Sequence, residues 1–187
     1  MKYEKLGSFA EIKSGYTFRG MLTGVPGGRV VVFQPRDIIS GNKNNLVRIA
    51  TKSVPDGHFI EMGAVLLTNR GTFYARVFND KFAAVTTSGA FVVRVSPESG
   101  ILPEYLALYI NSDIGQRQIA SKLEVMTVPA LTIRQIQELE VPVIPKHKQE
   151  MLVKMCGVCQ HCEDVVLEIQ KQTKSFVNQV LKGVIDG

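Results

Sequence analysis

The chain has 187 residues, of which 45% are hydrophobic and 21% charged, and it carries a formal net charge of +5. This composition is ordinary for a soluble globular protein and excludes a disordered chain. The length suits one domain with a sizeable core and some additional chain.

The sequence shows no sign of membrane insertion or export. No apolar run approaches the roughly 20 residues of a membrane-spanning helix. The opening MKYEKLGSFAEI lacks the apolar core of a signal peptide. The three cysteines, at 156, 159 and 162, lie too close together for a disulfide framework. We therefore expect a cytoplasmic protein with reduced thiols.

The basic excess lies entirely in the first part of the chain. Residues 1–150 contain 18 Lys+Arg against 13 Asp+Glu, a difference of +5, whereas residues 151–187 contain four of each. A basic domain joined to a neutral segment favours a polyanionic partner for the domain. The alternative is that this modest excess only keeps the protein soluble.

The first part of the chain predicts a helix, a turn region, a strand and a loop. Ser8 and Glu11 fit a capping box at the start of a helix that Gly15 would end. Glycine-rich turns follow, and RVVVFQ then reads as a buried strand. Residues 35–52, PRDIISGNKNNLVRIATK, form a predicted polar loop.

Residues 64–95 contain four short β-rich segments separated by turns, which predict an antiparallel set of strands. The first two are VLLT and FYARVF, and the predicted hairpin bend between them contains Asn69, Arg70, Gly71 and Thr72. Such a polar bend in an apolar hairpin indicates a polar contact there.

The next segments are mainly helical. Pro103 stands at a predicted helix start, a second helix follows over Ile114–Leu123, and Thr132 with Gln135 forms a capping box before a short third helix. EVPVIP then predicts an edge strand, because its prolines cannot donate hydrogen bonds in a sheet centre. Together these elements predict an α+β domain with a mixed or antiparallel sheet over residues 1–145.

Residues 146–187 predict one long C-terminal coiled-coil helix. Apolar residues alternate at spacings of three and four over four heptads. We call these nine residues the seam: Leu152, Met155, Cys159, Cys162, Val166, Ile169, Thr173, Phe176 and Val180. A helix over 152–182 would be roughly 45 Å long. The seam needs a partner, and Thr173 is its weakest residue.

The sequence contains no recognisable catalytic constellation. CGVCQHC at 156–162 allows a zinc interpretation, but on a continuous helix His161 points about 100° away from Cys162, so we expect packing and no metal. His58 and His147 are predicted to be solvated. There is no GxGxxG, P-loop, HExxH or Asn/Asp-Pro-Pro-Tyr segment.

Four segments resemble the specificity subunits of type I restriction-modification systems. KLGSFAEIKSGYTFRG is similar to the family's opening helix and glycine turn, and LLTNRGTFYARVF to its strand, Arg-Gly-Thr turn and strand. Residues 101–145 resemble the carboxy-terminal signature in order and spacing, and KQEMLVKM resembles the start of the spacer helix. The chain departs from the family at Thr86-Thr87-Ser88-Gly89, where members often have an Asn-Gln pair.

The resemblance implies a non-catalytic protein that reads one half of a split DNA site. Separate modification subunits methylate adenine, and a restriction subunit supplies cleavage. S-adenosylmethionine, ATP and magnesium are then expected only on those partners. Full-length members usually have two recognition domains and two spacer helices, whereas this chain has one of each. The resemblance therefore implies a half-length specificity subunit that forms a homodimer through the seam.

Under this interpretation the hairpin bend contacts DNA. Arg70 would bind phosphate or guanine, Asn69 would pair with adenine, and Thr72 would lie beside them. The alternative is that Arg-Gly-Thr only forms the bend and Arg70 packs on Tyr74.

Base reading is expected chiefly from the loop at 35–52, which is rich in the donors and amides that recognise base edges. Its candidates are Arg36, Asn42, Lys43, Asn44, Asn45, Arg48 and Lys52. Tyr16 and Arg19 in the glycine turn are further candidates. The alternative for this segment is an ordinary solvated loop. Two other hypotheses for the whole chain are a protein-interaction adaptor without DNA binding and a zinc enzyme.

Overall fold

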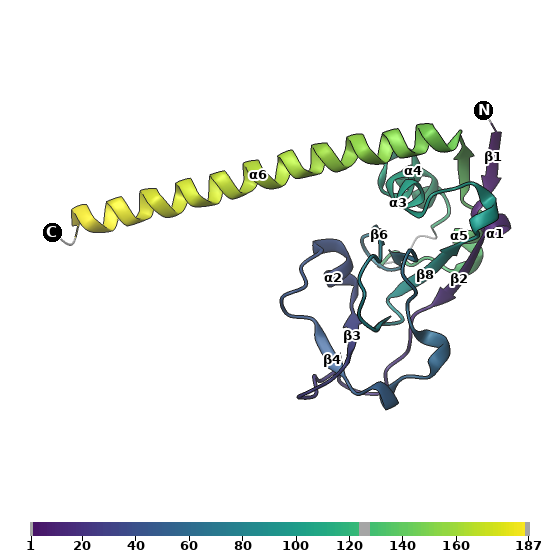
Figure 1. The fold of residues 1–187 in the computed structure, drawn as a ribbon, viewed down its shortest axis with the longest axis horizontal. Helices are drawn as coiled ribbons and strands as arrows, with labels where there is room; N and C mark the ends of the chain where they lie inside the picture. The colour runs from purple at the N-terminus through teal and green to yellow at the C-terminus, as the bar shows by residue number, and fades with distance from the viewer. Residues whose placement is uncertain (1, 124–127, 186–187) are drawn as a thin grey trace. The chain divides into compact units, whose positions relative to one another are not determined.

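The computed structural model describes residues 2–123 and 128–185. The chain divides into two compact units, Met1–Gln149 and Glu150–Gly187, which we call unit 1 and unit 2. Unit 1 contains all the strands and the shorter helices, and most of the long helix α6 belongs to unit 2 (Figure 1).

The largest sheet of unit 1 is antiparallel throughout. Its strands, in spatial order, are β2 (Ala10–Ser14), β8 (Ala90–Val95), β5 (Val65–Thr68) and β6 (Ala75–Val77). The predicted hairpin is therefore confirmed, because β5 and β6 pair antiparallel with Leu66 opposite Arg76.

A second sheet contains both an antiparallel and a parallel pair, which agrees with the mixed alternative of the prediction, although the sequence did not identify the parallel strands. It has the order β4 (Val47–Ile49), β3 (Val30–Phe33) and β7 (Ala84–Thr86). The prediction that all strands over 64–95 form one antiparallel set is wrong for β7, which runs parallel to β3. All residues of both strands are buried, as is usual where strands pair in parallel. The Thr86 hydroxyl donates to the Phe33 carbonyl at 2.9 Å.

The amino-terminal helix is shorter than predicted. Strand β1 (Lys2–Lys5) leads into α1 (Leu6–Phe9), and Ala10 already begins β2. The capping box predicted at Ser8 is wrong: the Ser8 hydroxyl donates to the Lys5 carbonyl, and Glu11 lies in the strand. Pairing of β2 with β8 outweighs the local helical pattern here.

The predicted helices after residue 100 are confirmed. They are α3 (Pro103–Asn111), α4 (Asp113–Ser121) and α5 (Ile133–Gln137). Pro103 begins α3, and Thr132 and Gln135 form the capping box of α5 with bonds of 3.2 and 2.8 Å. Within the described residues, strand β9 (Glu140–Val143) pairs with β1 alone, which agrees with the prediction of an edge strand.

The segment 35–52 is more ordered than a loop. It begins with helix α2 (Pro35–Ser40) and continues into β4. Gln34 and Asp37 form a capping box at the start of α2, and Gly41 ends the helix with a left-handed φ of 67°. Three short 3₁₀ turns complete unit 1: η1 (Thr51–Ser53), η2 (Asp56–His58) and η3 (Pro97–Ser99).

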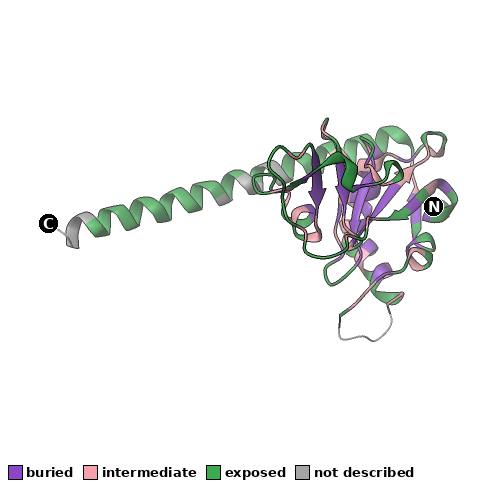
Figure 2. Cartoon of the chain, turned by 90° about the horizontal axis from the view of Figure 1, so that it is seen from below, coloured by how far each residue is buried: buried purple, intermediate pink, exposed green. Residues whose placement is uncertain are grey.

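A hydrophobic cluster holds α2 against both sheets. Ile38 of α2 is fully buried and packs with Phe33, Leu66 and Phe78, which come from β3, β5 and the residue after β6. Figure 2 shows these buried strands inside unit 1. This packing places the polar face of α2 and the segment after it at the surface.

Helix α6 (Lys146–Ile185) has 40 residues. Its first turn belongs to unit 1 and is fixed there by Gln149, which is fully buried. The Gln149 amide donates to the carbonyls of Gly100 and Ile144, and its oxygen accepts from the Leu102 backbone N–H, each at 2.8 Å. Among the residues that the structure describes, α6 and the other helices are too short or too polar to cross a bilayer.

Candidate nucleic-acid interface

The first candidate surface lies on α2 and the segment that follows it. Three of the predicted residues, Arg36, Asn42 and Asn45, line one surface pocket of about 330 Å³ together with Asp37 and Ser40. A guanidinium and two amides thus face one hollow at the edge of unit 1. Such groups can donate to guanine and pair with adenine in a major groove.

We call residues 41–46, between α2 and β4, the reading loop. Side chains within it order its backbone: the Asn42 N–H donates to the Ser40 hydroxyl at 3.2 Å, and the Asn44 N–H donates to the Asn42 side-chain oxygen at 2.9 Å. The Asn42 oxygen is therefore already engaged, whereas the side chains of Asn44 and Asn45 are exposed.

The cations around this loop differ in their availability. The Lys43 ammonium lies 2.6 Å from a carboxylate oxygen of Asp80, so it is neutralised within the chain. Arg36 is exposed, and its Nε atom lies at a longer distance of 3.6 Å from a carboxylate oxygen of Asp37. Arg48 on β4 and Lys52 on η1 are exposed and make no ion pair with the part of the chain that the structure describes. Arg36, Arg48 and Lys52 are thus the cations most open to a polyanion.

Of the two candidates in the glycine turn, Tyr16 and Arg19, only Arg19 is exposed enough to contact DNA. The Tyr16 ring is half-buried and packs edge-on against Phe18 and His58, at centroid distances of 4.8 and 5.0 Å. Its backbone N–H donates to the Thr86 carbonyl. The prediction that His58 is solvated is wrong, because this contact half-buries its ring. Arg19 is exposed on the same turn.

The hairpin bend contains one buried candidate, Asn69, and two exposed candidates, Arg70 and Thr72. Asn69 is only 6% exposed, its amide donates to the Ser88 carbonyl at 2.9 Å, and its backbone pairs with Gly89 and Leu131. This burial argues against base pairing by Asn69. Arg70 and Thr72 are exposed beside it.

The glycine in the bend is required by its backbone. Gly71 has a left-handed φ of 70°, and its N–H donates to the Pro129 carbonyl at 2.9 Å. The Thr68 hydroxyl donates to the Thr72 carbonyl at 2.6 Å and closes the turn. The guanidinium over the Tyr74 ring is that of Arg76, at 5.5 Å from the centroid, and not that of Arg70.

Two functional candidates, Arg76 and Asp80, were missed from the sequence. Arg76 lies in an apolar strand segment and Asp80 in the turn after it. Arg76 contacts the last turn of α2 and Asp80 contacts the reading loop, each from more than 30 residues away. The sequence signals were a lone arginine within FYARVF and an acidic residue in an otherwise basic domain. Neither signal indicates which residue the side chain contacts.

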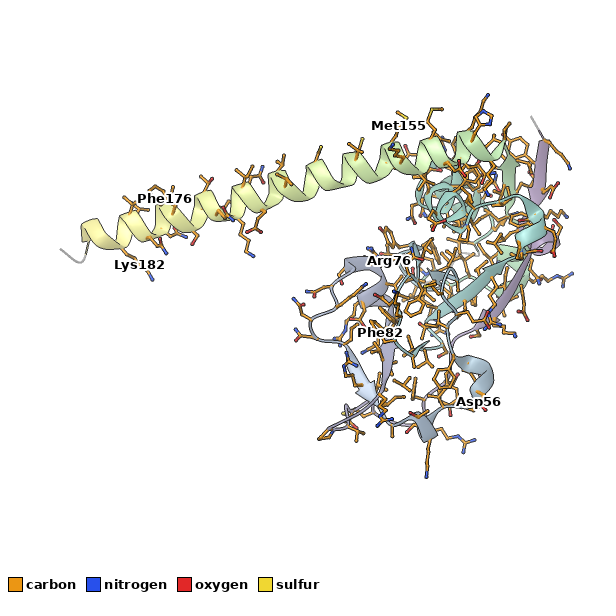
Figure 3. The ribbon with its side chains drawn as sticks, viewed as in Figure 1. Asp56, Arg76, Phe82, Met155, Phe176 and Lys182 are labelled. Carbon is orange, nitrogen blue, oxygen red and sulfur yellow. The ribbon has the colours of Figure 1, made fainter. Side chains whose placement is uncertain are left out.

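The second candidate surface is the seam on unit 2. Its apolar residues are exposed in the single chain, including Ile169 at 58% and Phe176 at 66%. Figure 3 labels Met155 and Phe176 of this seam on α6. Cys156, Cys159 and Cys162 are also exposed on α6. The side chain of His161 lies outside the described residues. Among those described, no His, Cys, Asp and Glu side chains cluster as metal ligands.

Another pocket of unit 1 does not coincide with the polar surfaces. It has a volume of about 690 Å³ and lies between α1, β2, β8 and the turn before β5. Arg94 in its wall pairs with Glu61 at 3.0 Å and more distantly with Glu11. None of the predicted DNA-binding residues lines it.

The comparisons with known proteins agree with the fold. No protein-family model matches the sequence, and no curated protein matches it. Among solved structures, a chain from a study of complex assembly and conformational transition in the type I R-M system aligns with a TM-score of 0.74 and 18% identity. That alignment covers 99% of this chain and 44% of the other.

Two further structures are named as S or HsdS subunits. The type I restriction-modification S subunit from M. genitalium aligns with a TM-score of 0.59 and 16% identity, over 86% of this chain and 39% of that one. The HsdS subunit from Thermoanaerobacter tengcongensis aligns with a TM-score of 0.62 and 21% identity, over 86% and 37%.

This chain has the fold of a type I restriction-modification specificity subunit. The resemblance inferred from its four sequence segments is thus confirmed at the level of the fold. The chain spans less than half the length of each specificity-subunit chain or type I system chain that it matches. Both candidate surfaces, the one around α2 and the seam on α6, are parts of this fold.

Proposed function

We propose that this protein is a sequence-specific DNA-binding specificity subunit of a type I restriction-modification system. Residues 1–145 would be the target recognition domain, which reads one half-site, and residues 146–187 the spacer and dimerisation helix. The chain would be non-catalytic and would direct separate methyltransferase and restriction subunits. S-adenosylmethionine, ATP and magnesium would act on those partners.

The observation that carries this proposal is the pocket lined by Arg36, Asn42 and Asn45 on a chain with the specificity-subunit fold. Arginine recognises guanine through two parallel bonds, and asparagine recognises adenine in the same way. The exposed Arg48 and Lys52 lie just beyond the reading loop in sequence, where they would bind phosphates. Lys43 would join them only after leaving Asp80.

The hairpin bend would serve as a second anchor. Arg70 and Thr72 are exposed at a turn whose backbone is held by Thr68, Ser88 and Pro129. A rigid turn with an exposed cation suits a phosphate, which orients the protein without specifying a base. Tyr16 and Asn69 would support these surfaces without touching DNA, and Arg19 would add a peripheral charge.

The seam supports a homodimer. Eight of its nine residues, all except Thr173, are apolar residues or cysteines, and the single chain leaves these eight exposed. Two antiparallel helices would bury both seams and carry the two recognition domains at opposite ends. Two-fold symmetry would then favour an inverted-repeat DNA site.

A binding selection tests the DNA-reading role. The full chain is equilibrated with duplexes containing randomised segments, and the selected site and a random duplex are then titrated at several salt concentrations. We expect a preferred sequence and an affinity that falls steeply with salt. Replacing Arg36, Lys43 and Arg48 with Glu should abolish binding to both duplexes.

The matched control reverses the same number of charges elsewhere. Arg117, Lys146 and Lys148 are exposed on α4 and the start of α6. Replacing them with Glu changes the net charge equally and should leave sequence preference unchanged. Equal binding by both triple variants would remove the α2 surface from the proposal. A wild-type chain without any preferred sequence would favour a protein-interaction adaptor instead.

A further inference from the structure

The guanidinium of Arg76 closes the carboxyl end of α2. Its Nε donates to the Ile38 carbonyl at 2.7 Å and its Nη2 donates to the Ile39 carbonyl at 3.3 Å. Carbonyls in the last turn of a helix have no partners within the helix, and a cation is favourable there. Figure 3 shows Arg76 beside α2, although it belongs to β6.

Gly41 is shaped to receive this guanidinium. A Cβ atom at Gly41 would lie 2.8 Å from the Cζ and Nη2 atoms of Arg76 and 2.9 Å from its Nη1 atom, closer than real contacts allow. The left-handed φ of 67° at Gly41 also favours glycine. The flat group therefore lies directly against the backbone at the point where the reading loop leaves α2. Arg76 in turn lies 5.5 Å from the centroid of the Tyr74 ring.

The strand that carries Arg76 is itself held firmly. Arg76 lies opposite Leu66 of β5, which is buried in the hydrophobic cluster beneath α2. The preceding residue, Ala75, exchanges two 2.8 Å hydrogen bonds with the side chain of Asn111 on α3. A continuous set of contacts thus runs from α3 through β6 to the start of the reading loop.

We propose that Arg76 is a positioning residue for base reading, which rests on the proposed function of the reading loop. It sets the direction of the backbone after α2 and so the orientation of Asn42, Asn44 and Asn45. Arg76 does not contact DNA itself. Two of its donors are occupied by backbone carbonyls, and its side chain is half-buried. Base pairing by an amide requires two aligned hydrogen bonds, whereas a phosphate contact tolerates displacement. Arg76 therefore controls discrimination between sequences more than overall affinity.

The test is Arg76→Lys in the full chain, which keeps the charge but replaces the flat two-donor group with a single ammonium. We expect the affinity for the selected site to fall by about tenfold, as for the loss of one well-aligned base contact. The affinity for a random duplex and the salt dependence should remain those of the wild type. Arg117→Lys, at an exposed position on α4, is the matched control and should change neither affinity.

Hydrogen exchange without DNA gives a second measurement. The Gly41 N–H donates to the Asp37 carbonyl and the Asn44 N–H to the Asn42 oxygen, so both amides report on the reading loop. In Arg76→Lys these amides should exchange faster, while the Val92 and Val93 amides of β8 keep their wild-type protection. Gly41→Ala, which displaces the guanidinium from the other side, should reproduce the same loss of discrimination.

Each other outcome overturns the proposal. If the slope of log affinity against log salt falls in Arg76→Lys by the value of about one phosphate contact, Arg76 itself binds DNA. Equal loss of affinity for both duplexes would make its role purely structural. If the wild type discriminates between sequences and Arg76→Lys discriminates equally well, only this inference fails. If the wild type discriminates between no sequences, the proposed function fails with it.

Discussion

The Asp80 carboxylate lies 2.6 Å from the Lys43 ammonium and ties the middle of the reading loop to the turn after β6. The lysine side chain is 54% exposed and the aspartate side chain 18% exposed, so the pair lies at the surface with the acid more covered. One acidic residue thus neutralises a cation in the region where we propose that DNA binds.

Asp80→Asn is expected to strengthen binding to random duplex DNA severalfold. The substitution releases Lys43 for a phosphate and removes a charge that repels DNA. The plot of log affinity against log salt should become steeper by about 0.9, the value for one additional phosphate contact. Asp113→Asn, an exposed acid on α4, is the control with the same charge change. Weaker binding at an unchanged slope would show instead that the ion pair holds the loop in place.

Asn69 is expected to matter for stability and not for DNA recognition. Asn69→Ala removes the buried hydrogen bond to the Ser88 carbonyl and should lower the free energy of unfolding by about 1–3 kcal/mol. Urea denaturation of Asn69→Ala, with Arg70→Ala as the exposed control, measures this directly. Arg70→Ala should change stability by less than about 0.5 kcal/mol. A shifted base preference for folded Asn69→Ala would return Asn69 to the DNA-reading set.

Charges placed on the seam should abolish dimerisation. Ile169→Asp together with Phe176→Asp puts two carboxylates where the proposed dimer buries apolar side chains, and unpaired buried charges are strongly destabilising. Sedimentation should then show monomers. The control is Lys171→Asp with Asn178→Asp, which has the same seven-residue spacing on the outer face of the helix and should remain dimeric. A wild-type monomer at high micromolar concentration would defeat the homodimer itself.

The native cysteines can report how two antiparallel helices align. Aligning Val166 of one copy with Ile169 of the other places Phe176 opposite Cys159, so the largest seam side chain faces a small one. The same alignment places Thr173 opposite Cys162. It keeps Cys159 and Cys162 of the two copies apart, whereas a parallel dimer would bring like cysteines together.

We therefore expect mild oxidation to leave the wild-type chain uncrosslinked and to join two copies of Thr173→Cys through Cys162. Non-reducing electrophoresis shows the product, and adding Cys162→Ser should prevent it. Ser175→Cys, on the outer face of α6, is the control that should stay uncrosslinked. A disulfide between wild-type copies would indicate a parallel or shifted pairing.

Local signals in the sequence predicted the elements that depend on neighbouring residues. The Thr132 capping box and the Pro103 helix start involve contacts within three residues and are present as predicted. The helix predicted from Ser8 was wrong because Ile12 pairs across to Val93 on β8, which no local pattern reveals. The pairing of β7 with β3 was also missed, because it is a contact between residues more than 50 positions apart in the chain.

The candidate site was predictable in composition but not in arrangement. The wealth of amides and cations over 35–52 identified Arg36, Asn42 and Asn45, which the fold brings to one pocket. Asn69 belongs to the same residue types but is buried, because its bend pairs with the backbone of Ser88 and Leu131. Arg76 reaches Ile38 over a separation of 38 residues, so only the folded chain shows its role.

The pairing of β1 with β9 makes the proposed recognition domain an exchangeable cassette. Lys2 lies opposite Val143, so the chain enters and leaves unit 1 side by side on one two-stranded ribbon. A unit with adjacent entry and exit points can be replaced by another of different loop sequence without disturbing what it is joined to. Under the proposed function, recombination within these two short strands is therefore expected to give the chain a new DNA preference in a single genetic step, with its seam unchanged.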